Sequence, residues 1–214
     1  MSFNRTDSPE RKNTLLIFII PDSGTFVKAF AASIFAILLG MILRGEKMEP
    51  IMIVRNLYKI YHQGENEVRA LDGVSLTVDK GEFVAIVGRS GSGKSTIIKI
   101  LTAELQPTEG SVNVNGFALE KIRSRAIPYL RRTLGVIFQD FRLIENKSVY
   151  DNVAFAMRVI GAPEREIKKR VPYVLELVGL ENKGRRLPNE LSGGEQQRVA
   201  IARALVNNPS MIIA

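Results

Sequence analysis

A glycine-rich segment in the first half of the chain has the residue types that bind phosphate. It fits the pattern G-x-x-x-x-G-K-[ST] at every fixed position and reads Gly88-Arg89-Ser90-Gly91-Ser92-Gly93-Lys94-Ser95. Glycines let the backbone approach phosphate oxygens closely and present N–H groups to them. In this motif the lysine reaches the terminal phosphates and the final hydroxyl ligates Mg²⁺. The segment therefore predicts a site for ATP with Mg²⁺, in which Lys94 is catalytic and Ser95 is a metal ligand.

The residues on either side of this loop support the prediction. Glu82 to Val87 is a short apolar run between glycines, which is typical of a buried strand. Ser95 to Leu105 has a helical pattern, and a helix N-terminus favours an anion through its unpaired N–H groups and its dipole. Thr96 is the next residue of the predicted phosphate-binding set. A dinucleotide-binding fingerprint would need glycine or alanine at this position, so Thr96 excludes the dinucleotide-binding proteins.

A second motif begins the last predicted helix and reads Leu191-Ser192-Gly193-Gly194-Glu195-Gln196-Gln197-Arg198. Ser192 followed three residues later by Glu195 predicts a capping box at a helix start. The bare N–H groups of Gly193 and Gly194 at the same helix start would also bind an anion. The two interpretations are compatible, because a capped helix N-terminus is itself an anion site.

This segment resembles the signature sequence of ABC-type ATPases, and the glycine-rich loop resembles their P-loop. The resemblance implies that Ser192, Gly193, Gly194 and Glu195 of one subunit cover the γ-phosphate held by the P-loop of a second. It therefore implies a homodimer with two shared ATP sites. It also implies a catalytic and metal-binding role for Gln139, as the Q-loop glutamine.

Within that superfamily, other stretches resemble the FtsE family of cell-division ATP-binding proteins: Leu130–Arg132, Gly135–Phe141 and Val149–Phe155. This resemblance implies an FtsX-like transmembrane partner, a peripheral position on the cytoplasmic face of the cell membrane, and control of cell-wall hydrolases. It also implies that Tyr61 stacks on adenine. Two alternatives stay open: an ATPase for lipoprotein release or macrolide export, and a catalytically inactive nucleotide-binding fragment.

The periodicity of the chain from Met52 onward predicts an α/β protein with a mixed sheet covered by helices and a helical insertion over about residues 140–190. The resemblance implies the P-loop fold of ABC ATPases, which includes an antiparallel β part. Strands are expected at 53–57, 71–78, 82–87 and 111–114, and helices at 95–105, 120–133, 148–180 and 199–205. The resemblance to ABC ATPases implies a groove after the Q-loop that receives a helix of the membrane partner, and the apolar residues between Phe141 and Met157 would line it.

Residues 1–51 differ from the rest, because they contain two apolar runs and no motif. Ala29 to Leu43 carries no charge but is shorter than the roughly 20 residues that span a bilayer. A membrane anchor, a packed helix and an extension upstream of a start at Met48 or Met52 all stay open. Because the FtsE resemblance begins at Met52, we expect two parts, 1–51 and 52–214, and expect the first to be dispensable for nucleotide binding.

The last residues, Met211 to Ala214, resemble the strand that leads into the Walker B carboxylates of ABC ATPases. Those carboxylates complete the metal shell and orient the attacking water. We therefore expect this 214-residue chain to bind ATP without hydrolysing it.

Composition narrows the remaining classes of function. The chain has no cysteine, which excludes disulfides and thiolate metal sites. Its net charge is +8, but acidic residues are interleaved with the basic clusters, and aromatic residues do not alternate with the cations as in a nucleic-acid groove. We expect no nucleic-acid partner, and the positive charge suits a bound nucleotide and an anionic membrane nearby.

Overall fold

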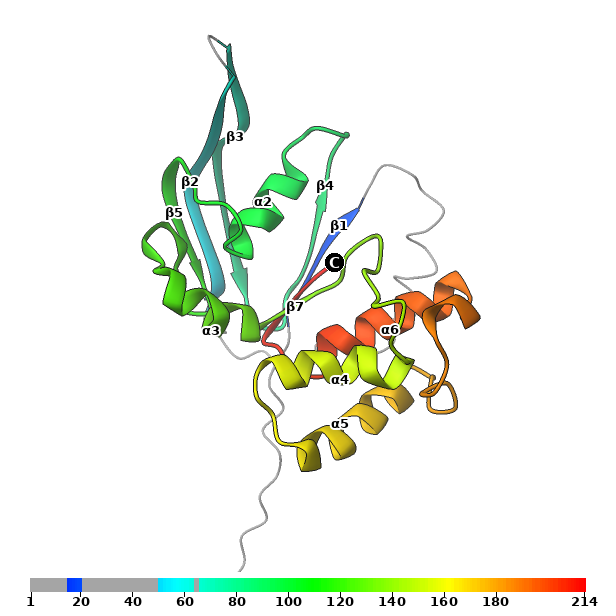
Figure 1. Ribbon diagram of the computed structural model, residues 1–214. Helices are drawn as coiled ribbons and strands as arrows, with labels where there is room; N and C mark the ends of the chain where they lie inside the picture. Colours follow the sequence, from blue (N-terminus) through cyan, green and yellow to red (C-terminus); the bar gives the residue numbers. More distant parts are fainter. Residues whose placement is uncertain (1–14, 21–49, 64–65) are drawn as a thin grey trace, which may run out of the picture.

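The computed structural model describes residues 15–20, 50–63 and 66–214, which form two sheets and a group of helices (Figure 1). The first sheet is antiparallel, with the strand order β3-β2-β5-β6. Its strands are β2 (Pro50–Gln63), β3 (Asn66–Asp79), β5 (Glu109–Val114) and β6 (Phe117–Ala118). Asn115 and Gly116 both have positive φ, the backbone of the tight hairpin turn that joins β5 to β6.

The second sheet is parallel, with the order β4-β1-β8-β7. It consists of β1 (Leu15–Ile20), β4 (Phe83–Val87), β7 (Leu134–Val136) and β8 (Met211–Ile213). Helix α2 (Lys94–Leu101) lies between the two sheets and contributes Ile97, Ile100 and Leu101 to the core that joins them. The P-loop strand and the helix after it are thus fixed by one shared apolar core.

The strand β1 lies between β4 and β8 and pairs with both. Its residues 16–20 are in register with 83–87 of β4, and its residues 15–17 are in register with 211–213 of β8. The structure differs here from the expected division at residue 52, because a strand from the first part completes the sheet of the second. The apolar run from Ala29 to Leu43 lies outside the described residues.

Three helices form a second core beside the parallel sheet: α4 (Val149–Val159), α5 (Glu164–Leu177) and α6 (Gly193–Leu205). Helix α6 also packs on the sheet, since a Cβ on Gly135 of β7 would lie 2.8 Å from the Ala204 carbonyl oxygen. The predicted helix over 148–180 is two helices, because the chain turns between them through Gly161, which has positive φ, and Pro163.

The predicted helix over 120–133 is broken into short helical pieces. Two 3₁₀ turns, Leu119–Lys121 and Ser124–Ala126, precede a short α3 (Ile127–Arg132). A further 3₁₀ turn, Pro188–Glu190, lies in the helical part before α6. The expected fold class is confirmed, with a parallel sheet, an antiparallel sheet and a helical part. Among the described residues, no helix combines the length and the apolar character needed to cross a bilayer.

Candidate nucleotide-binding site

The P-loop joins the end of β4 to the start of α2, as the motif requires. Gly93 is the N-cap of α2 with φ 86°, and no side chain accepts a hydrogen bond from the first turn of the helix. A Cβ on Gly93 would lie 2.3 Å from the Ala70 carbonyl oxygen, so only glycine fits there. The N–H groups of this helix start are therefore available to an external anion.

Lys94 folds back over the loop. Its Nζ donates to the carbonyl oxygens of Gly88 and Arg89, at 2.5 and 2.7 Å, and to Ser92 Oγ at 3.2 Å. An ammonium group held by neutral oxygens is free to exchange them for phosphate oxygens, which carry full charge. Ser95 is exposed on the first turn of α2, one residue further along.

Gln139, predicted to be the Q-loop glutamine, lies just beyond β7 and is exposed. Because β4 and β7 are parallel strands of one sheet, the P-loop and Gln139 both follow the carboxyl edge, where α/β sheets bind their ligands. The amide nitrogen of Ile137 donates to Ile213 O of β8 at 2.8 Å, which extends the pairing of β7 with β8 toward Gln139. The fold therefore places the predicted phosphate and metal residues on one edge.

The signature residues form the start of α6, and the predicted capping box is confirmed. Ser192 Oγ accepts from the Glu195 amide at 3.3 Å, and Glu195 Oε2 accepts from the Ser192 amide and hydroxyl at 2.9 Å each. These bonds, first the one from the Ser192 backbone, lower the pKa of Glu195 below its ordinary value. Figure 1 shows this helix start well apart from the loop between β4 and α2. A single chain does not bring the signature to its own P-loop.

The two signature glycines contrast with the P-loop glycine Gly93. A Cβ on Gly193 would meet nothing within 4 Å, and a Cβ on Gly194 would meet only the tip of Arg198, at 3.9 Å. Neither has positive φ. The chain itself therefore gives no steric reason for glycine at these two positions, whereas a ligand or a second chain approaching the helix start would.

Tyr61, predicted to stack on adenine, lies near the end of β2 with 36% of its surface exposed. Lys59 Nζ lies 5.3 Å from the centroid of its ring, in a cation–π contact that orients the side chain. The ring is thus accessible, and its role with adenine stays a prediction.

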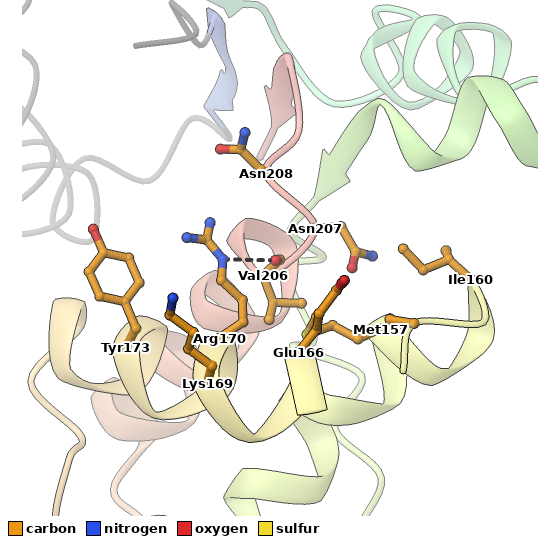
Figure 2. A pocket seen from close by; sticks show the side chains of 10 residues that line it. Met157, Ile160, Glu166, Lys169, Arg170, Tyr173, Val206, Asn207 and Asn208 are labelled. Atoms are coloured by element: carbon orange, nitrogen blue, oxygen red, sulfur yellow. Dashed lines mark hydrogen bonds between the residues drawn. The ribbon is translucent and has the colours of Figure 1, made fainter. Parts of the chain in front are cut away.

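A groove of about 550 Å³ lies in the helical part, between α4, α5 and the segment after α6 (Figure 2). Lys169, Arg170 and Tyr173 of α5 stand opposite Val206 and Asn207. Arg170 donates to the carbonyl oxygens of Val206 and Leu205, which fixes α5 to the end of α6. Asn207 Nδ2 donates to Ala156 O at 3.1 Å, but its Oδ1 is buried without a partner.

This groove was only partly expected from the sequence. Of the predicted apolar patch between Phe141 and Met157, only Met157 lines it. Val149 is fully buried in the helical core, and Phe155 is exposed at 49% without lining the groove. The other walls come from α5 and the segment after α6, residues that are distant in sequence and carry no motif.

Comparison with known proteins decides among the families that share a P-loop. The family model described as "ABC transporter" matches residues 71–214, two thirds of the chain. The chain belongs to the ABC transporter family. The resemblance drawn from the P-loop and the signature is therefore confirmed.

Relatives narrow the membership to FtsE-like ABC ATPases. The "Cell division ATP-binding protein FtsE" of Streptococcus pneumoniae is 54% identical over 77% of this chain and 70% of its own length. FtsE of Mycobacterium tuberculosis is 57% identical over 68% of this chain and 63% of its own length. A methionine import ATP-binding protein of Carboxydothermus hydrogenoformans reaches 44% over 76% of this chain and 48% of its own.

Solved ABC cassettes share the fold. A dimeric ATP-binding cassette in a post-hydrolysis state, bound to ADP and Pi, superposes with a TM-score of 0.67 at 39% identity, covering 75% of this chain and 72% of that one. A second dimeric structure, of a bacterial ABC transporter cassette, gives a TM-score of 0.68 at 38% identity over the same shares.

Proposed function

We propose that this chain is the ATP-binding subunit of an FtsE-type membrane complex, in which two copies hold ATP between them and a transmembrane subunit docks on the helical part. The observation that carries the proposal is the pair of signature glycines at the open start of α6. None of the residues that the structure describes requires glycine there, yet the P-loop that would need this helix start lies elsewhere in the same chain. A second copy related by a two-fold axis supplies the missing half of each site.

The residues at the carboxyl edge suit Mg-ATP. Backbone N–H groups of the P-loop and of the first turn of α2 would bind phosphate oxygens, and Lys94 would leave its carbonyl partners to balance the charge on the terminal phosphates. The hydroxyl of Ser95 and the amide oxygen of Gln139 are the hard oxygen donors that Mg²⁺ prefers. When bound, the metal ion would neutralise charge on the phosphoryl group being transferred.

The shared-site proposal predicts that nucleotide binding and dimer formation depend on different residues. Gly193→Ala should leave monomer stability and ATP affinity nearly unchanged, because the added methyl group meets no atom of the chain. It should weaken ATP-dependent dimer formation, measured by analytical ultracentrifugation with and without Mg-ATP. Lys94→Ala should reduce ATP binding itself. Dimers that form equally well in the Gly193→Ala variant would exclude the signature from the shared site.

The groove between α4, α5 and the segment after α6 supports docking of a helix from the membrane partner. Its lining includes the apolar side chains of Met157, Ile160 and Val206, and its charged members are Lys169, Arg170 and one carboxylate, Glu166. Such a groove fits an amphipathic helix that presents apolar anchors. By this proposal the chain sits at the cytoplasmic face of the membrane through its partner.

Two adjacent residues give a matched test of the docking proposal. Ile160→Asp places a carboxylate in the groove and should weaken co-purification with an FtsX-like membrane subunit. Val159→Asp is the control, because Val159 is 65% exposed and does not line the groove. Equal loss in both variants, or loss only in Phe141→Ala, would move the docking surface to the patch predicted from sequence.

A further inference from the structure

Arg203 connects the signature helix to the Q-loop. It lies near the end of α6, eleven residues after Ser192, and its guanidinium reaches across to the loop after β7. Nη1 donates to Arg142 O and Nη2 to Phe141 O, both at 2.6 Å. The two parallel N–H groups of one planar guanidinium thus bind two consecutive carbonyl groups, a fixed geometry that a lysine lacks.

The segment that Arg203 binds has an unusual backbone. Phe141 and Arg142 have φ values of 55° and 45°, the left-handed region that side chains with a Cβ rarely adopt. The chain turns tightly there: the Phe141 amide donates to Phe138 O at 3.0 Å, and the Arg142 guanidinium stacks at 4.0 Å over the Phe138 ring. Such a conformation persists only where surrounding contacts hold it, and Arg203 supplies two of them.

The loop around Gln139 is held on three sides. Before it, Ile137 donates to β8. After it, the fully buried Asn152 of α4 bonds both the amide and the carbonyl of Ile144, at 2.7 and 3.0 Å. Arg203 holds the intervening turn and joins it to α6. Its guanidinium is largely removed from water, and this burial lowers the pKa of Arg203 from its ordinary value, with the charge partly balanced by Asp140.

We infer that Arg203 is a positioning residue, which ties Gln139 to the signature helix so that the placement of one depends on the placement of the other. This inference rests on the proposed function. Helix α6 begins at the residues that would meet the nucleotide of the partner subunit and ends at the contact with the Q-loop. A shift of α6 when two copies close on ATP would therefore act on the backbone beside Gln139 through the Arg203 guanidinium.

The test uses Arg203→Met, which removes the guanidinium but keeps an apolar stem, and Arg203→Lys. Arg131→Met is the matched control, since Arg131 also donates to two carbonyl groups, those of Thr102 and Ala103, away from the Q-loop. ATP affinity is measured with Mg²⁺ and with EDTA. We expect Arg203→Met to lower Mg-ATP affinity roughly three- to tenfold, to leave metal-free affinity unchanged, and to add nothing to the loss caused by Gln139→Ala.

A spectroscopic arm separates loop positioning from general stability. The chain contains no tryptophan, so Phe141→Trp creates a single reporter on the Q-loop. In the chain that keeps Arg203, the fluorescence emission of this tryptophan should respond to Mg-ATP. Arg203→Met should make the indole ring more accessible to the quencher acrylamide, and Arg131→Met should not. Arg203→Lys should restore neither property.

Two results would overturn the inference. One is an equal loss of affinity with and without Mg²⁺ in Arg203→Met, with a fall in melting temperature like that of Arg131→Met; this would reduce Arg203 to a structural contact. The other is full additivity with Gln139→Ala. Failure of the unmodified chain to bind ATP would instead contradict the proposed function, and the quenching comparison would then still test whether Arg203 holds the loop.

Discussion

The parallel sheet and the helical part of this protein are stabilised in different ways. The buried residues of the helical core come from one continuous stretch of the chain, residues 149–206, and Val153, Ile167, Val171 and Val199 are fully buried in it. The parallel sheet is assembled from four distant segments, and the P-loop strand β4 pairs with a single neighbour, β1. The phosphate-binding region therefore depends on remote contacts, whereas the signature and the groove stand on a locally formed unit.

The two faces of β4 show the same difference. Val84 and Ile86 pack against the core shared with α2. On the other face, Phe83 and Val87 are 47% and 71% exposed. The helical part also exposes large apolar side chains, such as Phe155 and Val159, but these lie on a helix with its own complete set of backbone hydrogen bonds and not on an edge strand. Disturbing the sheet should therefore cost nucleotide binding more than disturbing the helices does.

The largest effect is expected from the central strand. Ile17→Pro removes an amide from the middle of β1, between its pairs with Val84 and Ile213, and a proline there should break the strand. We expect a loss of about 3 kcal/mol or more in unfolding free energy and loss of ATP binding, measured by thermal unfolding and by titration with a fluorescent ATP analogue. Removal of residues 1–14 should leave both unchanged.

This prediction competes with the expectation drawn from the sequence that residues 1–51 are dispensable. A chain that starts at Met52 and binds ATP as tightly as the full chain would show that β4 and β8 do not need β1. The proposed difference in stabilisation between the parallel sheet and the helical part would then be supported only by the exposed apolar face of β4.

The next largest effect is expected at the P-loop. Gly93→Ala places a methyl group against the Ala70 carbonyl at a residue with φ 86°, so the turn must move. ATP affinity should fall by at least tenfold, since about 1.4 kcal/mol of strain is enough for that change. Gly184→Ala in the helical part is the control, because its φ is not positive and its nearest neighbours lie at 3.8 and 3.9 Å. Equal affinities in the two variants would mean that the loop relaxes freely.

Within the helical part, Asn152 is the most sensitive polar residue. Its side chain is fully buried and bonds the Ile144 amide and the carbonyls of Ile144, Lys147 and Ser148. Asn152→Leu removes all four bonds and leaves the Ile144 amide and the Lys147 carbonyl without these partners, so it should lower the unfolding free energy by about 2–4 kcal/mol, measured by urea denaturation. ATP binding in EDTA should persist at temperatures where the variant is folded. Loss of that binding would show that the two regions are energetically coupled.

The smallest effect concerns the cap of α6. Hydrogen bonds from Ser192 hold the pKa of Glu195 below its ordinary value, so this carboxylate stabilises the fold above its unfolded pKa and the contribution is lost as pH falls through the lower folded pKa. Glu195→Gln should remove this part of the acid dependence, a small shift seen by comparing melting temperatures at pH 7 and pH 3.5. An unchanged difference between the two pH values would leave the cap without an energetic role.

Several features followed from the sequence alone because they depend on residues next to one another. The P-loop geometry needs glycines at fixed positions, and Gly93 is forced by its φ and by the strand beside it. The capping box joins Ser192 to a residue three positions away, so the pattern is sufficient to predict it. The same holds for the alternation between strands and helices.

Only the tertiary structure decided the contacts between distant segments. An apolar run such as Leu15–Ile20 is compatible with many neighbours, and nothing in its periodicity says that it lies between β4 and β8. Arg203 carries no local signal for its bonds to Phe141 and Arg142, because a guanidinium binds any carbonyl that packing brings within reach. The groove walls likewise meet through helix packing, where the partner of each face is set by the whole fold.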